Sequence, residues 1–189
     1  MEETMAAPTK ASDLSIEPGT WNIDPAHSAI EFTARHLVVT KVRGSFSSFS
    51  ASIEVAEDLT QSKISAEIDV ASVSTGEQER DNHLKSADFF DVEKFPKITF
   101  TSTSITPAGD HYALAGNLTI HGTTRSLTLN LEFNGVAKDP WGNTRSGFTA
   151  AGEISRKDFG MEWNVPLEGS GVLVSDKIQI SLEVELIKV

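Results

Sequence analysis

The sequence predicts an all-β fold of about eight long antiparallel strands, with one short helical insertion between the third and the fourth long strand. Three observations support this class. Apolar and polar residues alternate from Trp21 onward, most regularly over residues 177–186, which is the pattern of strands with one dry and one wet face. Turn-forming residues separate the alternating segments, for example at 107–110 and 139–143. A charged segment at 74–92 breaks the alternation and carries strong helix formers.

The elements follow in order along the chain. The first 19 residues are rich in Ala, Ser, Thr, Glu and Pro without periodicity, so a disordered tail is expected at 1–19, ahead of one domain at 20–189. Short connections favour an up-and-down order. Eight such strands either close into a barrel with room for one ligand or form a sandwich with a filled core, and periodicity does not choose between them. Long strands are expected near residues 28–36, 41–56, 63–73, 97–106, 111–120, 125–136, 146–155 and 177–188.

The insertion is expected to be helical on the N-terminal side and aromatic at its end. Thr75 is placed to cap a helix whose third residue is Gln78, a capping-box spacing. Phe89 and Phe90 then lie together on one side of a second short turn, and Pro96 restarts extended structure. Such an insertion in a sheet protein is expected to cover a sheet edge or a barrel mouth.

Composition limits the partners. The 189 residues fit one domain, and 27 acidic against 16 basic residues give a net charge of −11. This field repels phosphate backbones and anionic lipid surfaces, so nucleic acid is not an expected partner. The chain has no cysteine, hence no disulfides or thiol chemistry. It has no run near the ~18 apolar residues of a membrane span, and its acidic N-terminus is not a secretory signal. A cytoplasmic protein is therefore expected, or a secreted one if a leader was removed.

No catalytic constellation is visible among the polar residues. The five histidines lack the short spacings of a metal site, and no cofactor is expected. Arg80 and His83 lie three residues apart on one face of the predicted helix. They form either a solvated charged face or a functional pair that contacts a ligand head group or locks the insertion to the barrel rim. Arg156 either holds a strand-end turn through an Arg–Asp pair or joins this head-group set.

Aromatic residues are numerous, with ten Phe and three Trp beside a single Tyr. His36 lies four positions after Phe32 in the same expected strand, so the two side chains share a face. His36 is therefore expected to point inward near the end of the strand. Packed tightly, the aromatic side chains would form a solid core. Around a cavity, they would suit a long hydrocarbon, because the driving force scales with apolar area and needs no directional groups.

The chain resembles the YceI-like family of polyisoprenoid-binding proteins from about Trp21 to the C-terminus. The resemblance is carried by several motifs in a fixed order. They are Trp21-x-Ile23-Asp24-x-x-His27-Ser28-x-Ile30-x-Phe32, Gly44-x-Phe46-x-x-Phe49, Thr75 with Arg80-Asp81-x-His83-Leu84, Asp88-Phe89-Phe90-Asp91, Phe95-Pro96-x-Ile98-x-Phe100, Leu118-Thr119-Ile120-His121-Gly122-Thr123-Thr124 and Arg156-x-Asp158-Phe159-Gly160-Met161.

The resemblance implies an eight-stranded, lipocalin-like antiparallel barrel with a helical insertion and a long apolar channel. It also implies non-covalent binding of an isoprenoid chain, such as a prenylated quinone precursor, for storage or transport and without catalysis. Relatives have been connected with stress responses and with capture of hydrophobic antibiotics, and many carry a secretory leader that this chain does not show.

The alternation of strand faces and the family motifs together predict the ligand contacts. The expected channel residues are Phe32, His36, Phe49, Phe100, Phe148, Met161 and Trp163. Phe89 and Phe90 are expected to contact the ligand from the lid, and Arg80, His83 and Arg156 are the candidates for the head group or the lid latch. Two alternatives stay open, an enzyme acting on a hydrophobic substrate and a filled-core interaction or stress-response module. The pattern also allows a homodimer through an exposed edge or the barrel mouth.

Overall fold

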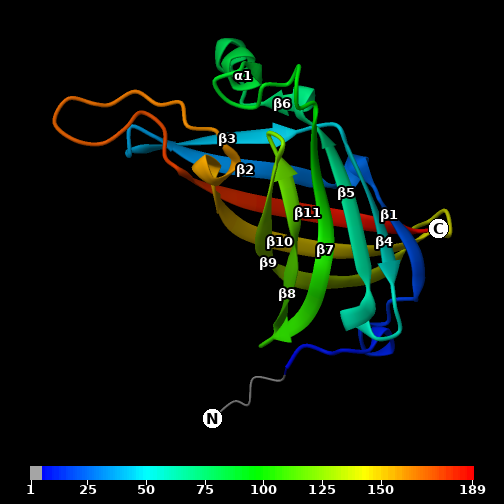
Figure 1. Cartoon of the computed structure of the whole chain (residues 1–189). Coiled ribbons are helices and arrows are strands. Elements are labelled where there is room, and N and C mark those ends of the chain that lie inside the picture. Colours follow the sequence, from blue (N-terminus) through cyan, green and yellow to red (C-terminus); the bar gives the residue numbers. More distant parts are fainter. Residues whose placement is uncertain (1–5) are drawn as a thin grey trace.

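The computed structural model describes residues 6–189, whose strands form one antiparallel sheet (Figure 1). The strands are β1 (Gly19–Ile23), β2 (Ala29–His36), β3 (Thr40–Phe46), β4 (Phe49–Val55), β5 (Lys63–Asp69), β6 (Val73–Ser74), β7 (Lys97–Ala108), β8 (His111–Ile120), β9 (Thr123–Lys138), β10 (Thr144–Ser155) and β11 (Lys177–Lys188). The helices in this part of the chain are α1 (Gln78–Lys85) and five short 3-10 helices, η1 (Ala11–Leu14), η2 (Pro25–His27), η3 (Leu59–Gln61), η4 (Val70–Ser72) and η5 (Arg156–Phe159).

The sheet closes into a barrel because β1 pairs with both β4 and β11. The closed ring has the order β1-β4-β5-β7-β8-β9-β10-β11. β2 prolongs β1 along β11 beyond η2, and β3, which pairs with β2, leads into β4. Each of these two pairs therefore acts as one interrupted long strand. The predicted eight-stranded antiparallel barrel, with a helix between the third and the fourth long strand, is confirmed.

The strand expected at 41–56 is in fact two strands separated at Ser47 and Ser48. The main-chain groups of Ser48 leave the sheet ladder: its N–H donates to Ser72 Oγ at 3.1 Å, and its carbonyl accepts from Asp69 N at 2.9 Å. The strand expected at 63–73 likewise ends at Asp69, whose carboxylate caps η4 by accepting from Ala71 N at 3.2 Å. Side-chain hydrogen bonds of Ser and Asp thus end strands whose apolar alternation continues.

The N-terminal segment closes one end of the barrel, here called the base, instead of forming the disordered tail predicted for 1–19. Residues 1–5 of that tail lie outside the described residues. Farther along, Ala7 N donates to Gly109 O at 2.6 Å and Leu59 N donates to Thr9 O at 2.7 Å. The segment therefore ties together the β7–β8 and β4–β5 connections. Its buried side chains are Ala7, Ala11 and Ile16.

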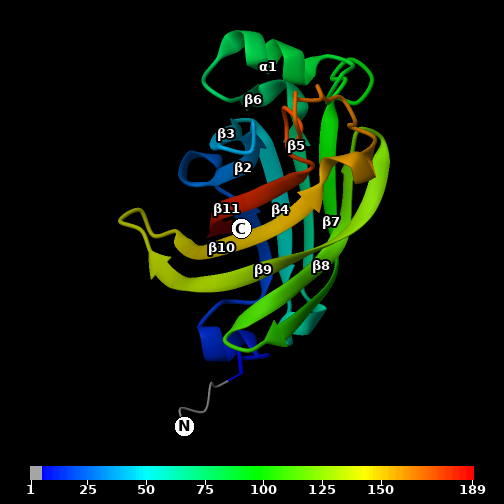
Figure 2. The ribbon, with the colours of Figure 1, turned by 90° about the vertical axis from the view of Figure 1, so that its left-hand side faces the viewer.

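α1 lies at the opposite end of the molecule from the N-terminal segment (Figures 1 and 2). Its N-cap is Glu77, whose carboxylate accepts from Glu79 N at 3.1 Å and from Arg80 N at 2.7 Å. The predicted Thr75 cap is therefore wrong; Thr75 N and Oγ1 instead donate to Asp81 Oδ1 at 2.8 and 2.6 Å. No residue of α1 is buried. Among residues 6–189, no helix is long and apolar enough to cross a bilayer.

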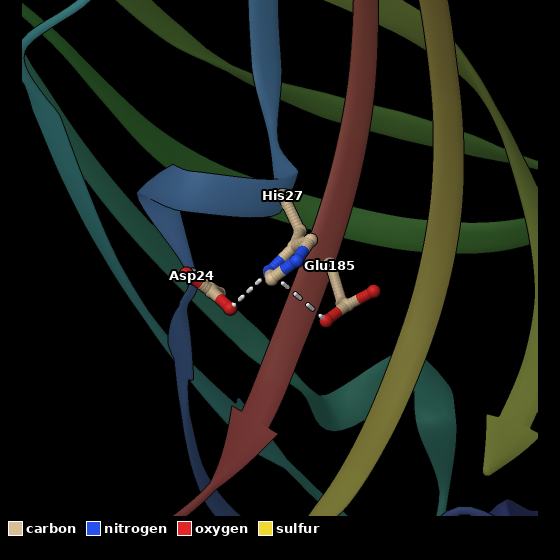
Figure 3. A group of neighbouring side chains, drawn as sticks. All are labelled: Asp24, His27 and Glu185. Atoms are coloured by element: carbon tan, nitrogen blue, oxygen red, sulfur yellow. Dashed lines mark hydrogen bonds and ion pairs between the residues drawn. The ribbon is translucent and has the colours of Figure 1, made fainter. Parts of the chain in front are cut away.

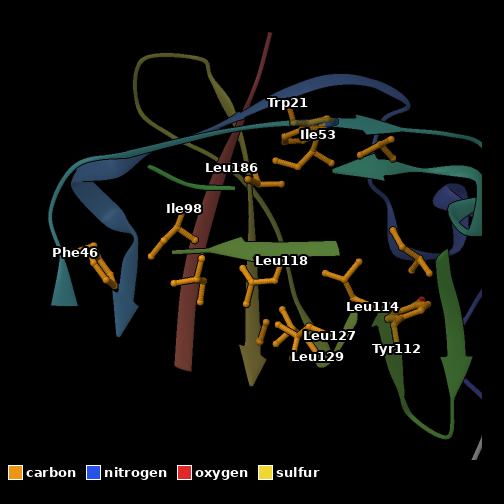
Figure 4. Close-up of a cluster of buried hydrophobic side chains, with 14 of the residues drawn as sticks. Trp21, Phe46, Ile53, Ile98, Tyr112, Leu114, Leu118, Leu127, Leu129 and Leu186 are labelled. Atoms are coloured by element: carbon orange, nitrogen blue, oxygen red, sulfur yellow. The ribbon is translucent and has the colours of Figure 1, made fainter. Parts of the chain in front are cut away.

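Buried side chains from every part of the ring meet inside the barrel (Figure 4). They occupy the inward positions of the alternating pattern, as in Leu127 and Leu129 of β9. Trp21 is fully buried at the closing strand β1, and its indole N–H donates to Glu17 O at 2.9 Å. This pairing fixes the chain between the N-terminal segment and the barrel wall.

Candidate functional site

The inner faces of the strands enclose an apolar cavity of about 320 Å³. This volume is at the lower end of the roughly 300–1,000 Å³ that ligand sites occupy. Leu14 and Ile16 line it from the base, and Phe89 and Phe90 line it from the α1 end. The cavity therefore runs along the barrel, so the solid core that the sequence left open as an alternative is not what the structure shows.

Two glycines let aromatic rings lie against the barrel wall and leave the axis open. A Cβ atom on Gly44 would lie 2.2 Å from the ring of Phe32, its neighbour across β2 and β3. A Cβ on Gly116 would lie 2.3 Å from the ring of Phe100. These rings cover the bare backbone of the glycines. The lumen is thus shaped by two aromatic–glycine pairs.

Aromatic contacts connect the wall to the helical insertion. The ring centroid of Phe46 lies 5.6 Å from that of Phe32 and 5.9 Å from that of Phe90. Phe89 is buried beside Phe90 at this end of the cavity. Residues 75–96, which contain α1 and this aromatic pair, are called the lid from here on.

The lid is held to the loop at 161–176 by side chains. His83 Nε2 lies 2.8 Å from Asp88 Oδ2 within the lid, and both side chains are substantially exposed. The His83 ring packs edge-on against Trp163, with centroids 4.6 Å apart, and Trp163 lies 5.3 Å from Phe89. His83 and Trp163 do not line the cavity. This geometry fits the lid latch predicted for His83. It does not fit the channel contact predicted for Trp163.

Arg156 is a buried guanidinium beside the cavity. Its Nε donates to Ser175 O at 3.0 Å, and its Nη1 donates to Met161 O and Trp163 O, both at 2.8 Å. Its Nη2 has Val174 O and Asp176 Oδ1 as acceptors at 3.5 and 3.4 Å. Burial lowers the pKa of Arg156, and Asp176 partly offsets this. A guanidinium has five N–H donors, and each has an acceptor here, so Arg156 fastens the 161–176 loop and has no donor left for a head group.

Two other polar candidates lie away from the cavity. Arg80 Nε donates to Thr75 Oγ1 at 2.7 Å and Nη2 donates to Thr75 O at 3.0 Å, which ties the side chain to the start of the lid. His36 ends β2, where it bridges to Val174, and does not line the lumen. The predicted residues that do line the cavity are Phe32, Phe49, Phe89, Phe90, Phe100, Phe148, Arg156 and Met161.

Much of the lining consists of aliphatic residues that were not among the predicted contacts. Alternation already placed Ile64 and Ile180 on dry faces, but an aliphatic face cannot be told from ordinary core by pattern alone. Leu14 and Ile16 were missed because they fell in the expected tail. The spacing of these two apolar residues just before Trp21 was the available signal.

A polar cluster on the barrel wall has the residue types of a metal site. Donor atoms of Asp24, His27 and Glu185 lie within 4.8 Å of one another (Figure 3). Arg145 Nη1 donates to Asp24 Oδ2 at 2.7 Å and to Glu185, while its Nε donates to Asp139 Oδ2 at 2.8 Å. The guanidinium thus takes the place that a cation would need. The cluster joins η2, β10 and β11.

The ionisation of this cluster follows from its contacts. Hydrogen bonds from His27 and Arg145 lower the pKa of Asp24 to about 2. Burial acts to raise the pKa of Asp139, but hydrogen bonds from Arg145 and Asn143 outweigh it and the pKa falls. The carboxylates accordingly raise the pKa of Arg145 above its usual value. We assign the cluster to stabilisation of the barrel wall.

Comparisons with known proteins agree with this geometry. A family model described as a YceI-like domain matches residues 21–186. The UPF0312 protein SA2479 of Staphylococcus aureus strain N315 is 39% identical over 167 residues, covering 87% of this chain and 95% of that protein. The crystal structure of Burkholderia cenocepacia BcnA matches with a TM-score of 0.71 and 26% identity, over 86% of this chain and 98% of that one. A polyisoprenoid binding domain from Saccharophagus degradans matches with a TM-score of 0.69 over 89% of this chain and 98% of that one; at 15% identity it shows the fold alone.

Proposed function

This chain belongs to the YceI-like family, and from that premise we propose that it binds the hydrocarbon chain of an isoprenoid or similar amphiphilic lipid in the barrel cavity, without catalysis, for storage or transport. The observation that carries the proposal is the continuous apolar lining, which extends from Leu14 at the base to Phe90 in the lid. The Saccharophagus degradans domain is described as polyisoprenoid binding. That description suggests the ligand class, and the cavity supports it.

The cavity volume sets the scale of binding. At ~30 Å³ for a water-sized group, 320 Å³ holds roughly ten methylene-sized groups. Burying ten methylenes yields about 8 kcal/mol before association costs. Micromolar affinity requires about 8 kcal/mol net, so once the association costs are subtracted ten methylenes alone give binding weaker than micromolar. Each methylene changes the binding free energy by only ~0.8 kcal/mol, so such a cavity selects its ligands by apolar length more than by chemical detail.

The polar groups near the cavity support binding over chemistry. The Tyr112 hydroxyl donates to Pro8 O at 2.6 Å, and the donors of Arg156 are satisfied by the protein. The His83–Asp88 pair, which an enzyme could use as an acid–base couple, lies in the lid outside the lining. A hydrophobic substrate in the cavity would meet no activated group among these residues.

The first test is organic extraction of freshly purified protein, followed by mass spectrometry and by titration with farnesol. Ala66→Phe places a ring in the lumen, and Ser65→Phe places the same ring on the outer face of β5 as its matched control. We expect Ala66→Phe to weaken farnesol binding by about tenfold or more and Ser65→Phe to change it by less than about twofold.

Three results would contradict the proposal. A folded Ala66→Phe protein with unchanged affinity would place the ligand elsewhere. A protein that neither carries a lipid nor binds farnesol would favour an interaction module. Conversion of the bound lipid to a new product would favour an enzyme.

A further inference from the structure

Exposed apolar side chains gather at one place on the surface. Seven large hydrophobic residues are exposed in the described part of the chain, and five of them lie on two neighbouring segments: Leu37, Val38, Val39, Val165 and Val172. Val38 and Val39 are the most exposed of the five, at 63% and 75%. We call these five residues the apolar tip. A cluster of this kind on a protein surface indicates an interaction surface, whereas single exposed residues do not.

The two segments of the apolar tip are joined by contacts. Leu37 N donates to Leu173 O at 3.0 Å, and His36 bridges to Val174. Figure 1 shows the β2–β3 connection and the 161–176 loop projecting from the same side of the barrel. The tip is thus one continuous feature built from both.

The backbone of the β2–β3 connection is strained for the residues it carries. Leu37 and Val38 have φ angles of 54° and 67°. Consecutive positive φ values in a hairpin favour Asn-Gly, and a β-branched residue there is an outlier that destabilises the fold. The chain therefore holds bulky apolar residues outward at a cost to folding. Such a departure from local preference points to a role of the exposed side chains themselves.

Basic side chains flank the tip on the outer face of the same hairpin. Arg35 and Lys41 are paired across β2 and β3, and Arg43 lies opposite Thr33 on the next outward position. None of the three forms an ion pair with any residue in 6–189. In a chain of net charge −11, three unpaired cations beside an apolar tip are a local reversal of charge.

Two acidic groups near this hairpin are paired, whereas Glu31, on an outward position of β2, forms no ion pair within residues 6–189. Glu153 pairs with Lys177 at 3.5 Å, and Asp176 pairs with Lys157 at 3.1 Å. Glu162 and Glu168 lie on the 161–176 loop, so the hairpin carries the positive charge of this region and the loop does not. Charges beyond about 8 Å are screened at physiological salt, so the local cations count for more at a nearby surface than the distant acidic excess.

From these observations we propose that the apolar tip, with Arg35, Lys41 and Arg43, docks the protein on an anionic lipid bilayer. The valines enter the interfacial region and the cations contact lipid phosphates, as in other peripheral attachments. The loop that carries Val165 and Val172 also carries Trp163, which packs on the lid residues His83 and Phe89. The docked face therefore adjoins the lid. This inference goes beyond the proposed function and concerns a different surface from the cavity.

The test is co-sedimentation of the full chain with vesicles of phosphatidylcholine, alone or with about 30% phosphatidylglycerol, at about 0.1 M and about 0.5 M NaCl. We expect binding to the anionic vesicles at low salt and little binding in the other conditions. Each cation at the surface contributes about fivefold, so Lys41→Glu with Arg43→Glu should weaken binding by about 25-fold or more. Val38→Asp with Val39→Asp should weaken it by about tenfold or more.

Matched controls come from other parts of the surface. Lys63→Glu changes an exposed charge on β5, and Trp141→Ser removes an exposed apolar side chain at the β9–β10 connection. Both controls should bind as the parent does, and circular dichroism should show all variants folded. Sedimentation velocity of the parent and of the double Val variant gives the oligomeric state.

The outcomes distinguish a lipid bilayer from a second copy of the chain as the partner that binds this face. Failure of the parent to bind anionic vesicles, or equal binding by the double Val variant, would overturn the proposal. Self-association abolished by the double Val variant, without vesicle binding, would assign the face to a second copy of the chain. Because farnesol titration reports the cavity independently, either result leaves the test of the proposed function unaffected.

Discussion

The two ends of the barrel are closed in different ways. At the base, the N-terminal segment is bound by main-chain hydrogen bonds to the β4–β5 and β7–β8 connections and buries Ala7, Ala11 and Ile16. At the other end, α1 buries none of its residues, and the lid is held to the 161–176 loop by packing of His83 and Phe89 on Trp163, while the His83–Asp88 contact inside the lid is exposed. Buried apolar contacts and shielded main-chain hydrogen bonds open only when much of the fold opens, whereas exposed side-chain contacts open locally. The base is thus the more firmly held end, and we propose the lid as the end through which a ligand would pass.

The largest expected effect comes from comparing two tryptophans, one at each end. Trp21 is fully buried at the base side of the wall, so Trp21→Ala should cost about 3–5 kcal/mol of the free energy of unfolding. For a chain of this size, that lowers Tm by roughly 6–20 °C. Trp163→Ala removes contacts to His83 and Phe89 and should cost about 1 kcal/mol. If calorimetry showed the same loss of Tm for Trp21→Ala and Trp163→Ala, the two ends of the barrel would unfold as one cooperative unit.

The second effect concerns Arg145, which bonds Asp24 just after β1 and Asp139 in the β9–β10 connection. Arg145→Met leaves these carboxylates without their cation and should lower Tm at neutral pH. Arg145→Lys, which keeps the charge but not the fork of donors, is the matched control and should lower Tm less.

The same cluster predicts the pH dependence of stability. Because the pKa of Asp24 is lowered from 3.8 to about 2, its contribution is complete above about pH 4 and is lost as the pH falls from 4 to 2. Urea unfolding between pH 2 and pH 6 should show this loss in the parent and a flatter profile in Arg145→Met. A parent whose stability is constant across this window would contradict the assignment.

Hydrogen exchange would sharpen the comparison without any substitution. The amides of Ala11 and Leu59 are bonded to carbonyls across the base, whereas those of Asp81 and Ser86 belong to the exposed lid. Peptides from the base should exchange at least about 100-fold more slowly than peptides from residues 76–95, since a sub-global opening suffices for the lid. Mass spectrometry resolves the two regions. Similar protection would mean that the lid opens only with the barrel.

Alternation recovered the strands because it reports which face of each strand is dry, and the family resemblance supplied the choice of a closed barrel over a sandwich. It also recovered most aromatic lining residues, as Phe32 and Phe100 show. It failed at the base, where η1 and its neighbours have no periodicity and are ordered by hydrogen bonds to distant segments. It also placed Trp163 in the channel, because a pattern gives the face of a residue but not the path of a loop.

The polar motif residues show a second limit of the sequence. Asp24, His27 and Arg156 carry the family resemblance and have the chemistry of binding groups, yet their partners are in the protein. Whether a charged residue is free for a ligand depends on distant acceptors such as Asp139 or Ser175 O, which local pattern does not contain. The apolar tip went unnoticed for a different reason. Leu37, Val38 and Val39 fall in the short connection between the strands expected at 28–36 and 41–56, and the local pattern does not show whether side chains there are exposed.

The smallest expected effect distinguishes the lid latch from the rest of the lid. Asp88→Ala removes the acceptor 2.8 Å from His83 Nε2, and because both groups are exposed it should cost less than about 1 kcal/mol of stability. The same loss applied to lid closure should raise the farnesol release rate in stopped flow by about two- to fivefold. Arg80→Ala is the matched control, since Arg80 bonds only within the lid, to Thr75 Oγ1 and O. If Arg80→Ala speeds release while Asp88→Ala does not, the lid is retained through its own folding and not through the contact that orients His83 against Trp163.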